Sequence, residues 1–399
     1  MSDNHKLFRM LEKVSKNLDI SPSVHKDAEE KYKAVGKWLA EGEYCLIDKK
    51  ICLKDGDIYA QGSIKIGTVV RPIGQEEFDI DLVFYTPNIS TDDISPETLK
   101  KLIGDRLKSE NSRYKDKVTP TNRGWCINYA NEFHLDITPS LDKMDEPDNN
   151  SELVADKKLK IYMPSNPKDY AEWFDSISLT IPKFKDTRGL FRSDIFMDSI
   201  SIEDSATVHT LPKHEETKLL LQRFVQIFKR HRSELYKDKS NKDKKHKPSS
   251  IIITTLATES YLYCIQRFSY DNEYDFMLDV LKYMPIFITR RGNEDWIENP
   301  TIKSENFAEK WNDKPIRKKH FYAWHDSCMK FFDKFHPDMG QDILFESLED
   351  GFGKDATQII RDEYIQGLSD SRKNGLIKAS TAITATEPLK AKINTFYGK

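Results

Sequence analysis

The sequence predicts an α+β fold in two parts, a domain built on a mixed sheet followed by a mainly helical domain. Short β-like runs separated by glycine and proline fill much of residues 1–150, whereas apolar residues at helical spacing dominate from about residue 213. The chain has 399 residues, and a single core stops growing near roughly 250–300 residues. We therefore expect a first domain over 1–212 that includes an N-terminal helix, a helical domain over 213–370, and a loosely held tail over 371–399.

Composition and charge exclude several classes of protein. The 62 Lys and Arg residues nearly balance the 65 Asp and Glu residues, so the formal net charge of −3 argues against a polycation that coats nucleic acid. No apolar run approaches the roughly 18 residues of a membrane-spanning helix, and the first residues lack the apolar stretch of a signal peptide. The five cysteines are scattered without zinc-site spacing. We expect a reduced, cytoplasmic protein without a membrane partner.

Each element of the first domain has a local signal. Apolar residues at steps of four, three and four predict an amphipathic helix over residues 23–42. A second helix is expected over residues 98–110. Strands are expected where β-like runs occur, at residues 58–64, 79–85, 123–129 and 133–138. Residues 143–156 are rich in acids and asparagine, which predicts a loop.

The second domain is predicted to open with a long helix. An apolar stripe covers residues 219–228, and another helix is expected over 248–263. The lysine-rich residues 237–247 between them predict a hydrophilic loop. His320 and His325 are five apart and do not share a helical face, so we expect ordinary contacts rather than metal ligation.

Two aspartates on one predicted strand are the first sign of chemistry. Alternate residues of a strand point to the same side, which puts Asp79 and Asp81 about 7 Å apart on one face. Their neighbours are apolar, so the strand belongs in a core. Two carboxylates there repel each other and lose solvation unless a cation compensates. Two divalent ions would do so, and they could also clamp an in-line phosphoryl displacement.

A third aspartate and a glycine turn extend this pattern. Asp136 lies between apolar residues in another predicted strand, and Gly62-Ser63 follows an apolar run where a tight turn could grip phosphates. A Gly-Ser pair alone is usually a plain turn, an Asp-x-Asp pair often lies on a solvated edge strand, and Asp136 alone could be a capped strand end. All three in this order, each in an apolar setting, favour one shared site.

These residues resemble the signature of the polymerase-beta-like nucleotidyltransferase superfamily. The amino-acid sequences of residues 61–72 and 77–82 are similar to those of the bacterial cGAS/DncV-like nucleotidyltransferases, which make cyclic oligonucleotide signals in anti-phage CBASS systems. Segments of the second half also resemble that family: residues 221–223, 228–232, 247–257, 298–300 and 305–311. The resemblance implies a polymerase-beta-like catalytic domain, a helical second domain and an active site in the cleft between them.

The resemblance also implies roles for individual residues. Asp79, Asp81 and Asp136 would bind two Mg²⁺ ions, for which Mn²⁺ could substitute. Residues that would hold the donor triphosphate in the first domain are Gln61, Gly62, Ser63 and Thr68. In the second domain a basic residue of the long helix and a serine of the next helix would complete this phosphate clamp. The candidates for these two positions are Arg223 or Lys229, and Ser249 or Ser250.

The function implied is synthesis of a cyclic oligonucleotide from ATP and a second nucleotide, with a cyclic trinucleotide containing adenine as the expected product. Two alternatives remain. The same chemistry could make linear oligoadenylate or transfer a nucleotide to RNA, a small molecule or a protein. The chain could instead be a catalytically silent nucleotide-binding sensor.

Partners are implied by the resemblance alone. Some relatives require a HORMA-domain activator under the control of an AAA+ ATPase, and some are ligated to targets through the C-terminus by a ubiquitin-like apparatus. Here the last residue is Lys399 rather than a simple glycine end. Residues 229–247 carry nine Lys or Arg against three acids, but Tyr236 is the only aromatic among them. Because base stacking needs interleaved aromatic residues, the composition of this segment favours a solvated loop rather than a site for a nucleic-acid activator.

Overall fold

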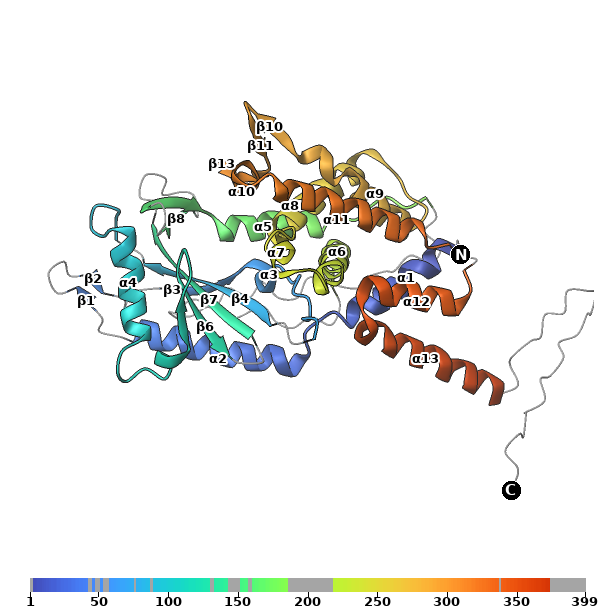
Figure 1. Cartoon of the computed structure of the whole chain (residues 1–399), viewed down its shortest axis with the longest axis horizontal. Helices are drawn as coiled ribbons and strands as arrows, with labels where there is room; N and C mark the ends of the chain where they lie inside the picture. The colour runs from blue at the N-terminus through green and yellow to red at the C-terminus, as the bar shows by residue number, and fades with distance from the viewer. Residues whose placement is uncertain are drawn as a thin grey trace, which may run out of the picture.

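The computed structural model describes residues 3–41, 45–46, 51–52, 57–74, 77–86, 89–129, 133–142, 151–156, 160–185, 218–336 and 339–373. A sheet domain occupies one end of the molecule and a helical domain the other (Figure 1). This arrangement confirms the α+β fold with a mixed sheet. The expected boundary at 212/213 lies outside the described residues, so it stays a prediction.

The sheet domain is built on seven strands. Five run in the order β3-β4-β7-β6-β5, and β8 pairs with both β7 and β9. Strands β4 and β7 are parallel, whereas the other pairs are antiparallel. The strands are β3 (Asp57–Gln61), β4 (Phe78–Thr86), β5 (Val118–Pro120), β6 (Trp125–Tyr129), β7 (Phe133–Asp142), β8 (Glu152–Asp156) and β9 (Ile161–Ser165).

The two faces of this sheet differ in chemistry. One face is apolar and packs against helices α2 (Pro22–Ala40) and α4 (Pro96–Leu107). Its strand residues include Ile80 and Leu82 of β4 with Leu135 and Ile137 of β7, all nearly inaccessible to solvent. Because side chains alternate along a strand, the residues between them point to the opposite face. That second face is polar and carries the aspartates of β4 and β7.

Both helices on the apolar face begin at a serine cap followed by proline. Ser21 accepts a hydrogen bond from the backbone N–H of Val24, and Ser95 accepts one from that of Thr98. A serine cap satisfies one of the free N–H groups of a first turn, and proline has the backbone angle that this turn needs. The helices therefore start one or two residues before the expected positions.

The helical domain surrounds α6 (Leu220–Lys237). Its apolar side chains Leu221, Phe224 and Phe228 are fully buried in a cluster to which most helices of this domain contribute. The other helices are α1 (Asp3–Lys16), α5 (Pro167–Ser178), α7 (Asn241–Lys244), α8 (Ser250–Arg267), α9 (Glu273–Tyr283), α10 (Glu309–Asp313), α11 (Ile316–Asp333), α12 (Gln341–Phe352) and α13 (Lys354–Lys373). Two strand pairs, β10 (Thr289–Arg291) with β11 (Glu294–Trp296) and β12 (Glu298–Asn299) with β13 (Ile302–Asn306), interrupt the helices. A further short pair outside this domain joins β1 (Cys45–Leu46) to β2 (Ile51–Cys52).

Four local expectations needed correction. The strand expected over 58–64 ends at Gln61, because Gly62 turns to a left-handed φ of 64° and starts the short helix α3 (Gly62–Lys65). The loop expected over 143–156 contains β8, which pairs antiparallel with the end of β7, the strand that precedes it in the chain. The loop expected over 237–247 contains the single turn α7. Of the tail expected over 371–399, the first three residues continue α13, and the rest lie outside the described residues.

Helix α1 was not expected from the sequence. It belongs to the cluster around α6, where Leu7, Phe8, Leu11 and Val14 are buried. Phe8 packs edge-on against Phe224 of α6, with ring centroids 6.0 Å apart. The start of the chain thus packs with its second half. Among the described helices, none is long and apolar enough to cross a membrane.

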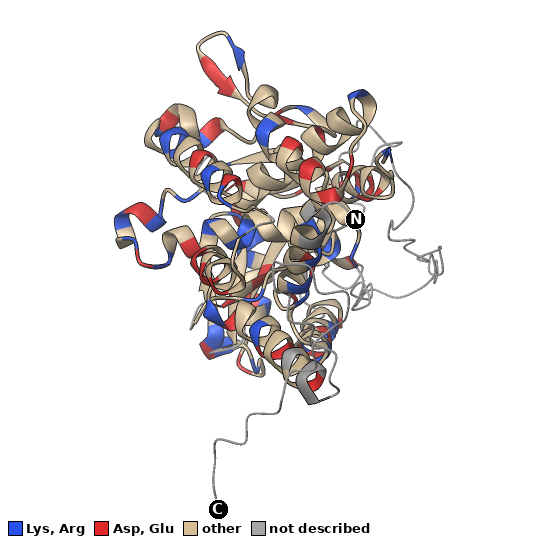
Figure 2. Ribbon diagram, turned by 90° about the vertical axis from the view of Figure 1, so that its right-hand side faces the viewer, with Lys and Arg blue, Asp and Glu red and all other residues tan. Residues whose placement is uncertain are grey.

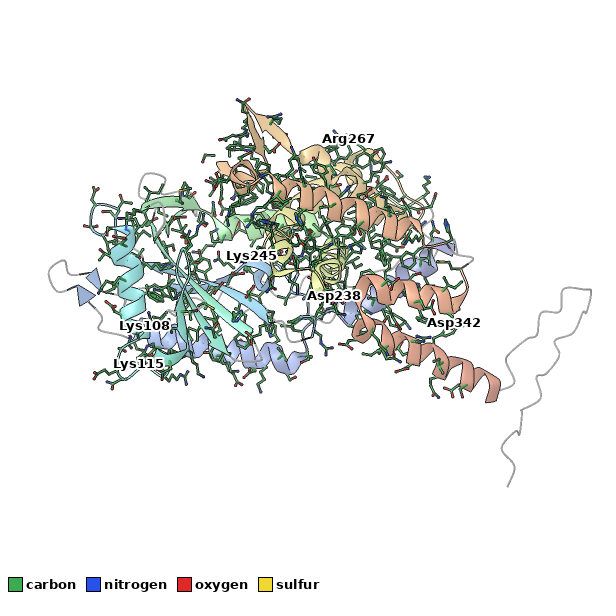
Figure 3. All side chains as sticks on the ribbon, in the orientation of Figure 1. Lys108, Lys115, Asp238, Lys245, Arg267 and Asp342 are labelled. Carbon is green, nitrogen blue, oxygen red and sulfur yellow. The ribbon has the colours of Figure 1, made fainter. Side chains whose placement is uncertain are left out.

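Close packing of α4 on the sheet predicts the effect of one substitution. A Cβ added at Gly104 would lie 2.1 Å from Cζ2 of Trp125, whose ring also lies under the ammonium of Lys108. Lys108 is labelled in Figure 3. We expect Gly104→Ala to lower the free energy of unfolding by about 1–3 kcal/mol, because the ring must move in a packed layer. Urea unfolding measures it. Gly367→Ala is the control, since Gly367 lies in exposed helix with nothing within 4 Å. Equal stability of Gly104→Ala and the wild type would contradict the prediction.

Candidate active site

The three predicted aspartates lie on adjacent parallel strands of the polar sheet face. In the register of β4 and β7, Asp81 is opposite Asp136 and Asp79 is opposite His134. This brings together carboxylates that are 55 residues or more apart in the sequence. Asp81 is the most deeply enclosed, whereas Asp79 lies toward the exposed end of the strand.

These carboxylates repel one another. Burial, followed by the charges of Asp136 and Asp79, raises the pKa of Asp81 from 3.8 to about 7, and the ammonium of Lys229 opposes this rise. Burial also raises the pKa of Asp136, to which the charge of Asp79 adds. A cation placed between these groups would relieve both the desolvation and the repulsion.

Two side chains of this face were missed in the sequence. His134 lies between two carboxylates, with Nε2 2.6 Å from Glu77 Oε2 and Nδ1 3.3 Å from Asp79 Oδ1. Cys126 of β6 pairs with Asp136 across the strands, and a hydrogen bond between them lowers the pKa of Asp136 against the effect of burial. The signal available for His134 was its position two residues before Asp136, since alternate residues share a face.

The donor set fits a hard divalent cation. Carboxylate oxygens are the ligands that Mg²⁺ and Mn²⁺ prefer, and the mutual repulsion of Asp81 and Asp136 is the electrostatic condition that such a cation would relieve. Within the described ranges, no three His, Cys, Asp or Glu side chains form a preformed metal group. Asp79, whose Oδ1 lies 3.3 Å from His134 Nδ1, would be the third ligand.

The Gly62-Ser63 turn lies directly against the carboxylates. Strand β3 pairs with β4 so that Gln61 is opposite Asp81, and the chain then turns at Gly62. A Cβ at Gly62 would lie 2.4 Å from Asp81 Oδ2, so only glycine permits this approach. The turn is closed by the backbone N–H of Thr68, which donates to the carbonyl of Ser63 at 2.9 Å.

Helix α6 contributes Lys229 to this region. The ammonium donates to Thr68 Oγ1 at 2.9 Å and to the Thr68 carbonyl at 3.3 Å. Burial and the charge of Arg232 lower the pKa of Lys229 to about 7, and the charge of Asp81 opposes this shift. Lys229 thus interacts electrostatically with Asp81 and holds Thr68 by hydrogen bonds.

The remaining sequence candidates occupy different places. Arg223 donates to Asp19 Oδ2 at 2.8 Å and to the carbonyl of Ser15, at the link between α1 and α2. Ser249 and Ser250 are exposed at the start of α8, and Ser250 Oγ accepts from Arg232 at 3.0 Å. Since Arg232 also acts electrostatically on Lys229, the start of α8 is connected with the Lys229 region, whereas Arg223 is engaged elsewhere.

The basic segment does not form a continuous surface. Lys229, Arg230 and Arg232 are buried within the helical core, so only its later lysines reach solvent. Asp238 and Lys245, labelled in Figure 3, flank the turn α7. Along the described elements of the ribbon in Figure 2, acidic and basic residues are interspersed.

The two histidines of the second domain make ordinary contacts. His320 Nδ1 lies 2.7 Å from the hydroxyl of Tyr236, and His325 Nε2 lies 2.7 Å from the carbonyl of Leu281. This agrees with the expectation from their spacing.

Repulsion among the carboxylates predicts a pH-dependent gain in stability for Asp81→Asn in metal-free protein. The folded-state pKa of Asp81, about 7, lies above its ordinary value of 3.8. The folded state therefore binds an extra proton between these values, and wild-type stability rises as the pH falls from about 7 to about 4. The asparagine variant lacks this rise, so it should be the more stable protein at pH 8 and approach the wild type in acid.

Urea unfolding in EDTA at pH 8 and pH 5 measures this difference. Asp116→Asn, at an exposed position, is the control and should follow the wild type at both pH values. If the wild type and Asp81→Asn are equally stable at pH 8, the carboxylates do not repel one another in the folded protein.

Comparisons with known proteins agree with this geometry. Residues 6–177 match SMODS, the Second Messenger Oligonucleotide or Dinucleotide Synthetase domain. The chain is 29% identical over 377 residues to the c-di-GMP synthase of Roseivirga ehrenbergii, covering 92% of this chain and 90% of the relative. It is 27% identical over 239 residues to the cyclic dinucleotide synthase CdnG of Bradyrhizobium diazoefficiens, covering 58% and 54%.

Solved structures share the fold. Bradyrhizobium diazoefficiens CdnG in complex with GTP has a TM-score of 0.63 at 19% identity, covering 90% of this chain and 98% of that one. The CdnC:HORMA-deltaN complex of E. coli MS115-1 has a TM-score of 0.55 at 12% identity, with 88% and 97% covered. GTP-bound DncV of Vibrio cholerae has a TM-score of 0.52 at 14% identity, with 89% and 90% covered.

The aspartates of β4 and β7, the glycine turn beside them, the matched domain and the shared fold lead to the same assignment. Residues 6–177 carry a Second Messenger Oligonucleotide or Dinucleotide Synthetase domain, and in sequence and fold the chain is similar to the cGAS/DncV-like nucleotidyltransferases (CD-NTases) of the polymerase-beta-like superfamily, which supports a nucleotidyltransferase that synthesises a cyclic oligonucleotide.

Proposed function

We propose that this enzyme condenses two nucleoside triphosphates into a cyclic dinucleotide that contains guanine. Both curated relatives are named for cyclic dinucleotide synthesis, and the one matched along 92% of this chain is a c-di-GMP synthase. The cyclic trinucleotide containing adenine, made with ATP as a substrate, was expected from the resemblance and is the competing product.

The observation that carries the proposal is the pair of facing carboxylates on β4 and β7 beside a glycine turn. In the reaction, a ribose hydroxyl oxygen of one nucleotide bonds to the α-phosphorus of another. The bond from that phosphorus to the leaving pyrophosphate breaks, and the hydroxyl loses its proton. A second attack of the same kind closes the ring. Two bound Mg²⁺ ions, or Mn²⁺, would neutralise the charge on the transferring phosphoryl group and on the pyrophosphate.

Each part of the site has a task in this proposal. Asp79, Asp81 and Asp136 would hold the two ions, with Asp136 oriented by Cys126. Asp136 would hold the ion next to the attacking hydroxyl and could accept its proton. The elements involved come from both domains, which supports a cleft between them as the place of reaction.

The donor triphosphate would lie along the glycine turn. The backbone and hydroxyl of Gly62-Ser63 would contact its phosphates, with Gln61 and Thr68 beside them. Lys229 is the basic residue of α6 best suited to the phosphate clamp, because its charge interacts with that of Asp81, whereas Arg223 is bound to Asp19. A serine at the start of α8, Ser249 or Ser250, would complete the clamp.

The biological setting is proposed from the family resemblance. We propose a role in anti-phage CBASS defence and a HORMA-domain activator under an AAA+ ATPase. The support for the activator is the shared fold with CdnC, which was solved in complex with HORMA-deltaN. A ubiquitin-like ligation through residues 394–399 concerns a segment outside the described residues.

Product analysis tests the reaction. Purified protein is incubated with Mg²⁺ or Mn²⁺ and four ribonucleotides, each α-³²P-labelled in turn, and the mixture is treated with phosphatase. We expect a phosphatase-resistant product that takes label from GTP. Label from ATP in a larger resistant product would instead identify the adenine-containing trinucleotide, and a phosphatase-sensitive ladder would identify a linear synthase. No product with or without a HORMA partner would favour the silent sensor.

The carboxylates themselves are tested in the same assay. Asp136→Asn should lower product and pyrophosphate formation by about 100-fold or more, because one ligand of the metal pair is lost. Asp116→Asn, an exposed aspartate, should leave the rate unchanged. Full activity of Asp136→Asn would exclude the proposed metal site.

The close approach of Gly62 to Asp81 predicts a steric effect on activity. Gly62→Ala should lower turnover by about 10- to 100-fold, since its Cβ would meet Asp81 Oδ2 at 2.4 Å and the turn or the carboxylate must shift. Gly292→Ala is a matched control, because Gly292 has a similar φ of 61° but nothing within 4 Å. Both variants carry the backbone strain of about 1–2 kcal/mol. Equal losses of turnover in the two variants would contradict the steric explanation.

A further inference from the structure

Helix α6 forms hydrogen bonds with residues 66–69, the segment that follows the Gly62-Ser63 turn. Three polar side chains at steps of four and three donate hydrogen bonds to this segment: Gln222, Gln226 and Lys229. Gln222 Nε2 donates to the carbonyl of Ile66 at 3.1 Å, and Gln226 Nε2 donates to that of Val69 at 2.7 Å. Residues at this spacing share one face of a helix. One face of α6 thus holds the carbonyls of Ile66, Thr68 and Val69, in a segment from the other domain.

The contact with Gln222 is made possible by a second left-handed glycine. Gly67 has a φ of 67°, and a Cβ there would lie 2.6 Å from Gln222 Nε2. The backbone of the segment therefore approaches the amide of Gln222 more closely than any residue with a side chain would allow. Gln222 is only 7% exposed, so little water competes for its hydrogen bond.

Residues 66–69 are connected by backbone hydrogen bonds to the Gly62-Ser63 turn, which lies against Asp81. The backbone N–H of Ile66 donates to the carbonyl of Gly62 at 3.3 Å, and that of Thr68 donates to Ser63 at 2.9 Å. A displacement of Ile66 or Thr68 would therefore move Gly62-Ser63. Because the Gly62 backbone lies against Asp81, such a movement would change the distance between the turn and the carboxylates.

We propose that Gln222 is a positioning residue, which sets the place of the Gly62-Ser63 turn relative to the carboxylates by holding Ile66 and Gly67 against α6. The inference rests on the proposed function insofar as the turn is taken to hold a nucleotide triphosphate. Through this contact the helical domain determines the geometry of a phosphate-binding turn that belongs to the sheet domain.

Gln222 permits a cleaner test than its neighbour Gln226. Gln226 is fully buried and also donates to Asp19 Oδ1 at 2.6 Å, so its replacement would disturb the link between α1 and α2. Gln222 Oε1 accepts from the backbone N–H of Leu219 at 2.8 Å. Glutamate at position 222 keeps this acceptor, so the start of the helix remains capped, and it replaces the donor to Ile66 by a carboxylate oxygen that repels the carbonyl of Ile66.

The first experiment compares Gln222→Glu with Gln366→Glu by hydrogen exchange of the whole chain. Gln366 is an exposed glutamine on α13 that bonds only to Asp370 among the described contacts, so it controls for the added charge. We expect exchange of the amides over residues 64–69 to increase at least about threefold in Gln222→Glu, and exchange of α8 to stay unchanged. Unchanged exchange over 64–69, or an increase that extends equally through α8, would overturn the positioning role.

The second experiment measures the binding of a non-hydrolysable GTP analogue in the presence of Mg²⁺. We expect Gln222→Glu to bind it roughly 3- to 10-fold more weakly than Gln366→Glu, which corresponds to the loss of one hydrogen bond. Equal affinities would overturn the role in nucleotide binding. If the wild type binds neither GTP nor ATP analogues, the proposed function fails, and the exchange experiment still decides whether Gln222 places the turn.

A double-mutant cycle isolates the contact between Gln222 and Gly67. Gly67→Ala alone introduces a Cβ that meets the amide of Gln222, whereas in Gln222→Ala that amide is absent. We therefore expect Gly67→Ala to weaken analogue binding less in the Gln222→Ala background than in the wild type, a coupling of about threefold or more. Strictly additive effects would show that the two residues act independently and would overturn the proposal.

Discussion

The structure depends on how charged and polar groups are buried where the sheet meets the helical domain. The polar sheet face carries Asp81 and Asp136, and burial with repulsion from neighbouring aspartates raises the pKa of both. A folded chain tolerates such groups only where other charges or ions compensate them. The ammonium of Lys229 on α6 compensates part of this negative charge, and bound cations could compensate the rest. The instability of the site without ions is the same property that would let it bind them.

Helix α6 unites the two domains because it is buried on nearly all sides. Its apolar residues form the centre of the helical cluster, and its polar residues Gln222, Gln226 and Arg230 donate to backbone carbonyls of the segment after the glycine turn. Buried polar side chains are stable only when they are hydrogen-bonded. The stability of the domain contact and the geometry of the site therefore depend on the same side chains, which means that a substitution in α6 can alter the site without touching it.

Local patterns were sufficient where a residue's role depends on its near neighbours. Strand alternation placed Asp79 and Asp81 on one face, helical spacing found α2 and α6, and the helices α4 and α8 were also expected. Local patterns failed at β8, at α1 and at His134. Strand β8 exists because it pairs with the edge of β7, and α1 packs on helices from the far end of the chain. For α1, whose Phe8 packs against Phe224, no window of sequence contains the partner. Strand β8 and His134 had nearby signals, a pairing partner 10 to 14 residues earlier and Asp136 two residues later, which the local patterns considered did not use.

The sequence by itself determined the chemistry available to this protein: three aspartates in apolar strands, a glycine turn and a long helix with one polar face. Tertiary structure decided which of these groups meet. The parallel pairing of β4 with β7 brought Asp136 opposite Asp81, and the packing of α6 directed Lys229 rather than Arg223 toward the acids. The physical reason is that residue type and spacing specify which faces must be buried. The partner that buries each face is chosen by the packing and hydrogen bonding of the whole chain.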